Sequence, residues 1–428
     1  MEKVSKTEWE ELLGSNQWEG LLNPLDLNLR KLILRCGDFC QGTYDSFDSD
    51  QNSKYCGSSR FGKKAFFRKV ANKSAEDEYT VDSFLYATSR IAVPKAFLSF
   101  SFSEEAWSRE SNWIGYIAVS SDEASQRLGR REIYVAWRGT IRKLEWVNVL
   151  VAKPTLLKPL LKPADTEATS HGQKHHWYNS LLGKKDSNDY ESEDDDDDNP
   201  KVMKGWLAIY NSSNPKSQFT KLSARSQILI KINALVNRYK DEGVSVVLTG
   251  HSLGASLAIL SAFDLVENGL SDVPVTAIVF GSPQVGNKAF NKRLGTFPNL
   301  RILHVKNQLD LITHYPSKYL GYVHTGVELE IDTRKSKSLK DSKNPSDWHN
   351  LQAILHIVAG WNGKEGEFEL KVKRSIALVN KYCAFLKDET LVPGKWWVEK
   401  HKRMVLNEDG DWVMAIPDEE DLPVLEEY

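Results

Sequence analysis

One serine in this chain stands in a context that favours nucleophilic catalysis. Ser252 is the centre of Gly250-His-Ser-Leu-Gly254, which has the pattern G-x-S-x-G. A sharp turn from a strand into a helix makes such a serine reactive, because it lifts the hydroxyl above the sheet. In so tight a turn a side chain at Gly250 or Gly254 would collide with backbone, and Ser252 must adopt strained angles. The amide of Leu253, at the start of the new helix, would then face a developing oxyanion.

The residues around this motif predict the two elements that the turn needs. The largely apolar, β-branched run 244–248 predicts a buried strand, and 255–265 predicts a helix rich in small residues. A chance match in a surface loop would lack both neighbours. We therefore interpret Ser252 as a nucleophile, and His251, inside the turn, as a packing and hydrogen-bonding residue that points away from it.

A serine nucleophile needs a base, and the base needs an acid that orients it. In α/β-hydrolases the acid and then the histidine follow the serine along the chain. Asp310 follows an apolar predicted strand, so we prefer it to Asp272, which precedes a strand. His349 begins a predicted helix after a polar loop. His356, seven residues further on and on roughly the same helix face, is the alternative base.

A second oxyanion donor is expected where another strand ends. The predicted strand 132–137 runs into Arg138-Gly-Thr140, a glycine followed by a hydroxyl residue. The amide of Thr140 would join that of Leu253 at the oxyanion. From spacing alone, an ordinary turn is the competing interpretation.

Strands alternate with helices along the chain, which predicts the α/β class with a mostly parallel central sheet flanked by helices. A polar link joins the strands 113–120 and 132–137 into a predicted hairpin. The other predicted strands are 80–88, 273–280, 300–305 and 321–331, and the other predicted helices are 223–239, 351–358 and 368–385.

The chain is expected to form one domain, 1–428, with three appended parts. Residues 1–45 carry apolar residues at helical spacing and predict a helical N-terminal cover. Residues 165–199 are polar and end in an acidic run, so they predict a flexible insertion. Residues 388–428 form a C-terminal extension.

Composition excludes several classes of function. The formal net charge is −2, which gives no electrostatic reason to bind nucleic acid. Four cysteines show no metal-ligand spacing, so we expect no metal or cofactor, and their scarcity fits a reducing compartment. The first residues resemble neither a secretory signal nor a transit peptide, and no run of about 18 apolar residues exists. We therefore expect a cytoplasmic protein. The oligomeric state is not indicated.

The set of motifs resembles the class 3, or fungal-type, lipases, and within them the plant phospholipase A1 branch that lacks a transit peptide. The resemblance runs from about Trp9 to Trp412. It rests on Trp137-Arg-Gly-Thr140, Gly250-His-Ser-Leu-Gly254, Phe280-Gly-Ser-Pro-Gln-Val-Gly-Asn287, Asp310, Trp18-Glu-Gly-Leu-Leu-Asn-Pro-Leu-Asp26, Phe84-Leu-Tyr-Ala-Thr88, Leu144-Glu-Trp-Val-Asn148, Trp348-His-Asn-Leu351 and Leu355-His-Ile-Val-Ala-Gly-Trp-Asn-Gly363.

The resemblance implies an α/β-hydrolase fold and removal of the sn-1 acyl chain from glycerophospholipids without a metal. It assigns Ser252 as nucleophile, Asp310 as acid and His349 as base, with Thr140 and Leu253 at the oxyanion hole. A phospholipid or other acyl lipid would be the substrate, met in transient contact with a membrane surface. Val149, where relatives often carry an acid, and the acidic insertion depart from the pattern and bear on substrate preference.

Two other functions stay open at this point. The first is a lipase for neutral lipids, monoacylglycerols or galactolipids, which would use the same three catalytic residues. The second is a catalytically idle, lipase-like protein that acts as a lipid-binding or signalling scaffold.

Overall fold

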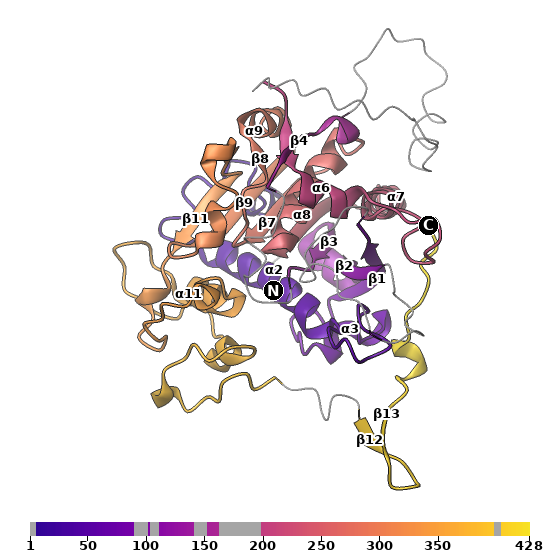
Figure 1. Ribbon diagram of the computed structural model, residues 1–428. Coiled ribbons are helices and arrows are strands. Elements are labelled where there is room, and N and C mark those ends of the chain that lie inside the picture. Colours follow the sequence, from indigo (N-terminus) through magenta and orange to yellow (C-terminus); the bar gives the residue numbers. More distant parts are fainter. Residues whose placement is uncertain (1–5, 90–101, 103–110, 141–151, 162–197, 398–403) are drawn as a thin grey trace, which may run out of the picture.

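A seven-stranded sheet crosses the centre of the computed structural model (Figure 1). Its order is β1-β2-β3-β6-β7-β9-β11, with β1–β2 and β2–β3 antiparallel and all later pairs parallel. The expected mostly parallel sheet is therefore confirmed. The strands are β1 Tyr79–Ala87, β2 Asn112–Ser120, β3 Arg131–Trp137, β6 Val244–His251, β7 Val275–Phe280, β9 Leu300–Asn307 and β11 Val327–Ile331. The structure describes residues 6–89, 102, 111–140, 152–161, 198–397 and 404–428.

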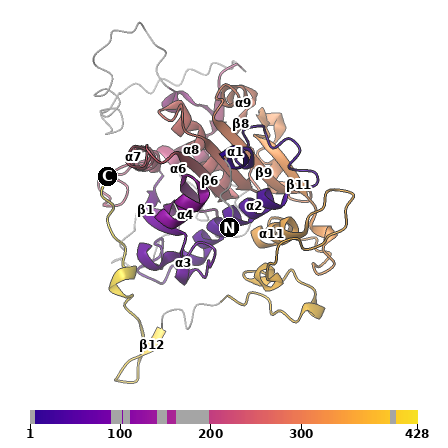
Figure 2. The ribbon, with the colours of Figure 1, turned by 180° about the vertical axis from the view of Figure 1, so that it is seen from behind.

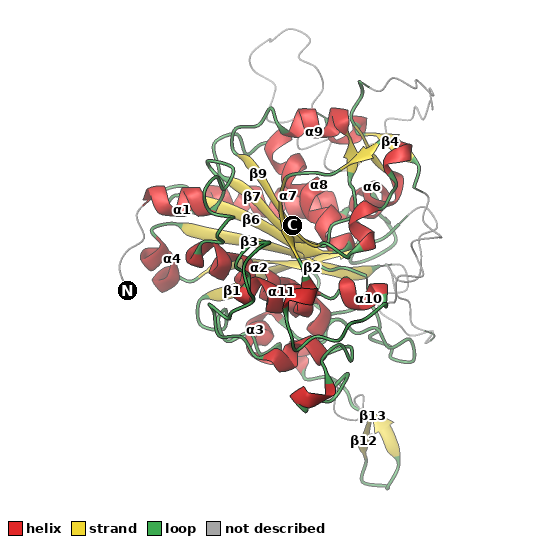
Figure 3. Cartoon of the chain, turned by 90° about the vertical axis from the view of Figure 1, so that its left-hand side faces the viewer, coloured by secondary structure: helices red, strands yellow, loops and turns green. Residues whose placement is uncertain are grey.

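Helices cover both faces of the sheet and make three layers (Figures 2 and 3). One face carries α6 Lys204–Asn211, α7 Ala224–Arg238, α8 Leu253–Glu267 and α9 Lys288–Leu294. The other carries α2 Leu27–Ser46, α3 Phe66–Lys69 and α11 Leu351–Gly360. The other α-helices among the described residues are α1 Lys6–Leu12, α4 Asp122–Leu128 and α10 Pro345–Trp348.

Two apolar cores fill the spaces between these layers, because successive strand residues point to opposite faces. In β6, Val246 and Leu248 pack toward α8, whereas Val247 packs toward α2 and α11. Both faces of the central strands are buried, which is why these strands are almost continuously apolar. Parallel strands surrounded in this way place all their carboxyl ends at one edge of the sheet.

Two smaller sheets lie outside the central one. The first of these sheets has four short strands in the order β10-β8-β5-β4. They are β4 Pro154–Leu156, β5 Lys201–Met203, β8 Gly286–Asn287 and β10 Tyr322–Val323. The second is a hairpin of β12 Met404–Leu406 and β13 Trp412–Met414, which projects from the body at the end far from α9 and β4 (Figures 1 and 3).

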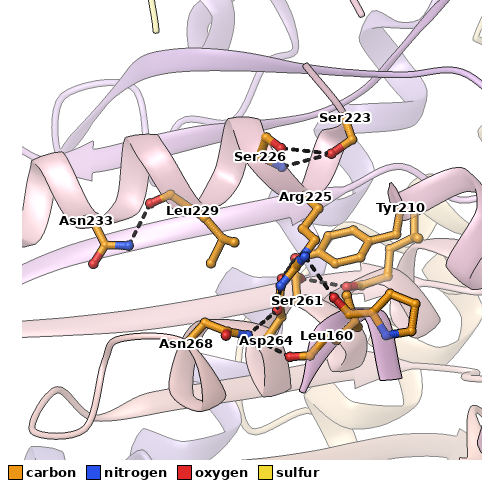
Figure 4. Close-up of polar contacts among 12 residues, drawn as sticks. Leu160, Tyr210, Ser223, Arg225, Ser226, Leu229, Asn233, Ser261, Asp264 and Asn268 are labelled. Atoms are coloured by element: carbon orange, nitrogen blue, oxygen red, sulfur yellow. Dashed lines mark hydrogen bonds and ion pairs between the residues drawn. The ribbon is translucent and has the colours of Figure 1, made fainter. Parts of the chain in front are cut away.

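A buried polar cluster holds α8, the helix that follows Ser252, against its neighbouring elements (Figure 4). The carboxylate of Asp264 accepts hydrogen bonds from Arg225 at 2.9 and 3.0 Å, from Tyr210 at 2.9 Å and from Asn268 at 2.7 Å. Arg225 and Asn268 also donate to the carbonyl groups of residues 159–160. The cluster thus ties α8 to α6, α7 and the segment 152–161.

Two sequence-based expectations for individual elements need correction, and one is confirmed. The predicted helix 368–385 contains only the 3₁₀ helix Ile376–Asn380, because the amides of Lys371 and Val372 bond to Ala359 at the end of α11 instead of to local carbonyls. The predicted hairpin is confirmed, because β2 and β3 pair antiparallel, and the link between them contains α4, whose first turn is capped by Ser121. The predicted strand 321–331 is split between β10 and β11, which belong to different sheets.

The appended parts are described to different extents. The N-terminal cover is two helices, α1 and α2, joined by turns. Almost all of the predicted acidic insertion 165–199 lies outside the described residues. The division into one domain with three additions stays a prediction. Among the residues that the structure describes, no helix is both long and apolar enough to cross a membrane.

Candidate active site

The turn at Ser252 has the strained geometry expected of it. Ser252 lies between the end of β6 and the start of α8, with φ 60° and ψ −126°. A Cβ atom at Gly250 would lie 2.1 Å from the carbonyl oxygen of Gly254, and one at Gly254 would lie 2.4 Å from that of Trp137. Only glycine fits either position, because real Cβ atoms do not approach backbone so closely.

Asp310 and His349 form a buried pair at the same edge of the sheet. Asp310 follows β9 and caps the 3₁₀ helix Leu311–His314, where its Oδ1 accepts the amide of Ile312 at 3.0 Å. Its Oδ2 lies 2.6 Å from Nδ1 of His349, the residue between α10 and α11. The carboxylate accepts a hydrogen bond from Nδ1–H of His349. With the proton on Nδ1, the imidazole has its lone pair on Nε2.

Gly281 brings this pair and the serine turn together. The amide of Ser252 donates to the carbonyl of Phe280 at 3.1 Å, and Gly281 follows with φ 51°. A Cβ atom at Gly281 would lie 3.0 Å from both Asp310 Oδ2 and His349 Cε1. Within the described part of the chain, Ser252 Oγ and His349 Nε2 are both buried and neither has a hydrogen-bond partner.

His251 supports the pair from the other side, in the bonding role expected from the sequence. Its Nε2 lies 3.0 Å from the carbonyl oxygen of His349, and its Nδ1 lies 2.7 Å from the hydroxyl of Tyr44 on α2. Burial, and secondly the charge of His349, hold the pKa of His251 well below its usual range. A neutral His251 therefore donates from Nε2 to His349 and accepts from Tyr44 at Nδ1.

The alternative histidine lies in a different environment. His356 Nε2 is 2.8 Å from Ser336 Oγ, and its ring packs on Phe368 at 4.8 Å. Burial, followed by the nearby Arg374, lowers the pKa of His356 to about 4. The structure thus brings Asp310 together with His349 and not with His356.

Both expected oxyanion donors belong to segments that pack against the serine turn. Leu253 is the first residue of α8, so its amide has no acceptor within the helix. Thr140 follows Gly139, where a Cβ atom would lie 2.5 Å from the carbonyl oxygen of His251. The buried guanidinium of Arg138 donates to the carbonyls of Trp113 and Gly139, which fixes the segment before Thr140. Burial lowers the pKa of Arg138 to about 9.

One cluster of possible metal ligands occurs in the described residues, formed by His304, His324 and Glu328, whose ligand atoms lie within 4.8 Å of one another. His304 Nε2, however, accepts the amide of Ser282 at 2.9 Å. Its Nδ1 must then carry the proton, so the neutral ring has no lone pair left for an ion. Burial lowers the pKa of His304 to about 3, which keeps it neutral. Its contact instead holds the segment that contains Gly281.

A hollow of about 530 Å³ lies away from these residues, at the amino ends of β3 and β6. Arg131, which lines it, pairs with Asp122 and Glu242, and the neighbouring Arg130 pairs with the buried Glu132. Because these charges are mutually neutralised and the serine turn lies at the opposite strand ends, this hollow offers no chemistry.

Sequence reasoning missed three contributors to the site, Tyr44, Gly281 and His304. The Gly281-Ser-Pro stretch was visible after a predicted strand, but nothing local tied it to Asp310. Tyr44 is 207 residues from its partner His251, so no spacing in the sequence could reveal it. His304 lies within the predicted strand 300–305, and nothing in the sequence tied it to Ser282.

A serine on a strained strand-to-helix turn, beside a buried Asp–His pair from later segments, defines the serine hydrolases of the α/β-hydrolase fold. Comparison with known proteins agrees. The family profile "Lipase (class 3)" matches residues 134–320. Phospholipase A1-IIdelta of Arabidopsis thaliana is 59% identical over 98% of this chain and 99% of its own. Phospholipase A1-II 5 of Oryza sativa subsp. japonica is 52% identical over 97% of this chain and 84% of its own.

The chain belongs to the class 3 lipase family and, within it, to the plant proteins named phospholipase A1-II. Solved structures of fungal lipases are also similar to it. Lip2 lipase of Yarrowia lipolytica aligns with a TM-score of 0.42 and 18% identity, over 72% of this chain and 81% of that one. A lipase of Rhizomucor miehei aligns with a TM-score of 0.38 and 17% identity, over 77% and 82%.

Proposed function

We propose that this protein is a phospholipase A1, which hydrolyses the sn-1 ester of glycerophospholipids through an acyl-enzyme. The observation that carries the chemistry is the 2.6 Å contact between Asp310 and His349 beside the buried hydroxyl of Ser252. The choice of substrate is supported by the relatives named phospholipase A1, which match almost the whole chain.

In the proposed mechanism, His349 Nε2 takes the proton of Ser252 Oγ as that oxygen attacks the ester carbonyl carbon. Asp310 holds the imidazole and stabilises its charged form. The amides of Leu253 and Thr140 bind the negative oxygen of the tetrahedral intermediate, each contributing on the order of 3 kcal/mol. The lysophospholipid leaves with the proton from His349. Water, activated by the same base, then cleaves the acyl-serine and releases the fatty acid.

The protein would act in the cytoplasm and touch its lipid substrate only transiently. None of the four cysteines, all of which belong to the described residues, forms a disulfide, which is compatible with a reducing compartment. The acyl lipid is the proposed partner. Nothing in the contacts of the described residues favours a cofactor in the reaction, since the base and the acid are both supplied by side chains.

Product analysis tests the substrate. Wild type and Ser252→Ala are incubated with phosphatidylcholine that carries different acyl chains at sn-1 and sn-2. Release of the sn-1 acid alone by wild type, and of neither acid by the variant, is expected. Release of both acids, or activity only on neutral glycerides or galactolipids, would instead make the protein a broader lipase. Failure of a fluorophosphonate probe to label Ser252 would favour the idle scaffold.

A matched pair of variants tests the acid. Asp310→Asn is expected to lower kcat about 10⁴-fold, because the amide cannot hold the same imidazole tautomer. Asp332→Asn is the control, since Asp332 follows the neighbouring strand β11 and caps a 3₁₀ helix in the same way. Equal rates for the two variants would remove Asp310 from the mechanism.

A further inference from the structure

The loop that follows Asp310 exposes large apolar side chains. We call residues 311–321, between Asp310 and β10, the rim loop. In it Leu311 is 59% exposed, Tyr319 is 89% exposed and Leu320 is 48% exposed. The rim loop leaves the carboxyl end of β9, so it stands on the same edge of the sheet as the serine turn.

The rim loop is anchored at both ends, so these side chains are held outward by structure. At its start Asp310 caps the helix Leu311–His314, and the carbonyl of Tyr315 accepts the amide of Gln284 at 2.7 Å. Ser317 caps the second helical turn, Lys318–Leu320. At its end, the hydroxyl of Tyr322 donates to the carbonyl of Ala152 at 3.1 Å. These contacts fix the backbone of the rim loop, so the exposure of Tyr319 is a property of an anchored loop.

Charge distinguishes the rim loop from the hairpin β12–β13, which also exposes apolar side chains. Residues 311–321 contain no Asp or Glu and one lysine, Lys318, whose Nζ lies 5.8 Å from the ring centroid of Tyr319. The hairpin β12–β13 also exposes Leu406 and Trp412, by 57% and 58%. Its turn, 407–411, carries three carboxylates. Phospholipid phosphates would attract the rim loop through Lys318 and would repel the acidic turn of the hairpin.

We propose that the rim loop is the surface through which this protein contacts a phospholipid bilayer. Tyr319 and Leu320 enter the interface, where an aromatic ring with a hydroxyl and an aliphatic chain are both favourable, and Lys318 faces the phosphates. This inference rests on the proposed function, because it takes the lipid substrate as the partner. The loop that follows the proposed catalytic acid would thus also bind the bilayer and hold the site close to its lipid substrate.

Vesicle binding in a protein without turnover tests this proposal. Ser252→Ala is the parent, and Tyr319→Ser/Leu320→Ser is compared with the matched control Leu406→Ser/Trp412→Ser in sedimentation with phosphatidylcholine vesicles. The control likewise removes one exposed aromatic side chain and one exposed leucine, but from the distant hairpin. Binding about tenfold weaker is expected for the rim-loop variant, since interfacial affinity scales with buried apolar area, and unchanged binding for the control.

Activity assays in the wild-type background separate contact from chemistry. The rim-loop variant is expected to hydrolyse the soluble ester p-nitrophenyl butyrate at the wild-type rate and phosphatidylcholine vesicles about tenfold more slowly than wild type. If the soluble rate also falls, Tyr319→Ser alone replaces the double variant, because this side chain makes the least contact with the protein.

Three results would overturn the proposal. They are vesicle binding unchanged in the rim-loop variant, an equal loss in the hairpin control, and no binding of the parent to vesicles, as expected if another protein covers the rim loop. Failure of the proposed function is a separate result. In that case the wild type releases no sn-1 acid, while the Ser252→Ala parent still reports whether the rim loop binds lipid.

Discussion

The hydroxyl of Tyr44 lies 2.7 Å from Nδ1 of His251, and this contact joins the N-terminal helix α2 to the serine turn. His251 in turn bonds the carbonyl of His349 at 3.0 Å. Because His251 is held neutral, the tyrosine hydroxyl fixes which nitrogen carries the proton. The position of the proposed base therefore depends on a residue from the N-terminal cover.

Replacing Tyr44 should slow the reaction as well as destabilise the protein. Tyr44→Phe removes one hydrogen bond, worth about 1 kcal/mol, and releases the tautomer of His251. We expect kcat on a soluble ester to fall roughly fivefold. Tyr116→Phe is the control, since its buried hydroxyl donates to the carbonyl of Phe39 away from the site. Similar losses of kcat in both variants would show that Tyr44 acts only through stability.

A methyl group at Gly281 should disturb the Asp310–His349 pair. Gly281→Ala places a Cβ atom 3.0 Å from both members of the pair, and a displacement of this kind should lower kcat at least roughly tenfold. Gly129→Ala is matched to it, because Gly129 also has positive φ but has no atom within 4 Å of the added Cβ. Both variants should lose about 1 kcal/mol of stability. If kcat falls equally in both, backbone strain and not the pair is responsible.

Stability should fall in mild acid because His356 is buried in its neutral form. Its pKa is about 4 in the folded protein and about 6.5 when unfolded, so the unfolded chain binds the proton first as pH falls. The stabilisation is complete above pH 6.5 and is lost progressively toward pH 4. Between pH 7 and pH 5 this amounts to about 2 kcal/mol.

Urea unfolding of wild type and His356→Gln at the two pH values measures this contribution. The glutamine amide can still reach Ser336 but does not titrate in this range. The wild type should lose about 2 kcal/mol more than the variant between pH 7 and pH 5. Parallel losses would place the acid sensitivity in other groups, such as His304.

The last residues of the chain should stabilise the edge of the sheet. Glu426 accepts the amide of Phe84 on the edge strand β1 at 3.0 Å and pairs with Lys63 at 3.0 Å. Glu426→Ala leaves that amide without its acceptor, which should lower the free energy of unfolding by about 2 kcal/mol. Denaturation with urea measures it, and the exposed neighbour Glu427→Ala should stay within about 0.5 kcal/mol of wild type. An unchanged stability in Glu426→Ala would mean that the tail does not hold the edge.

The sequence alone determined the parts of this protein that depend on neighbouring residues. The serine turn is five residues long, and its two glycines, its strand and its helix are all local, so Ser252 could be proposed as the nucleophile directly. The central strands were equally visible, because burial on both faces makes them continuously apolar. Asp310 followed from its place after such a strand.

Only the tertiary structure decided which distant groups meet at this turn. His349 and His356 lie only seven residues apart at one predicted helix, and the pairing of Asp310 with one of them depends on how α11 packs on α2. Tyr44 and His304 contact the site across 207 and 22 residues, through side chains that no periodicity singles out. The expected helix 368–385 was wrong for the same reason, since its amides bond to the end of α11. Contacts of this kind depend on the packing of whole layers, which the pattern of nearby residues does not contain.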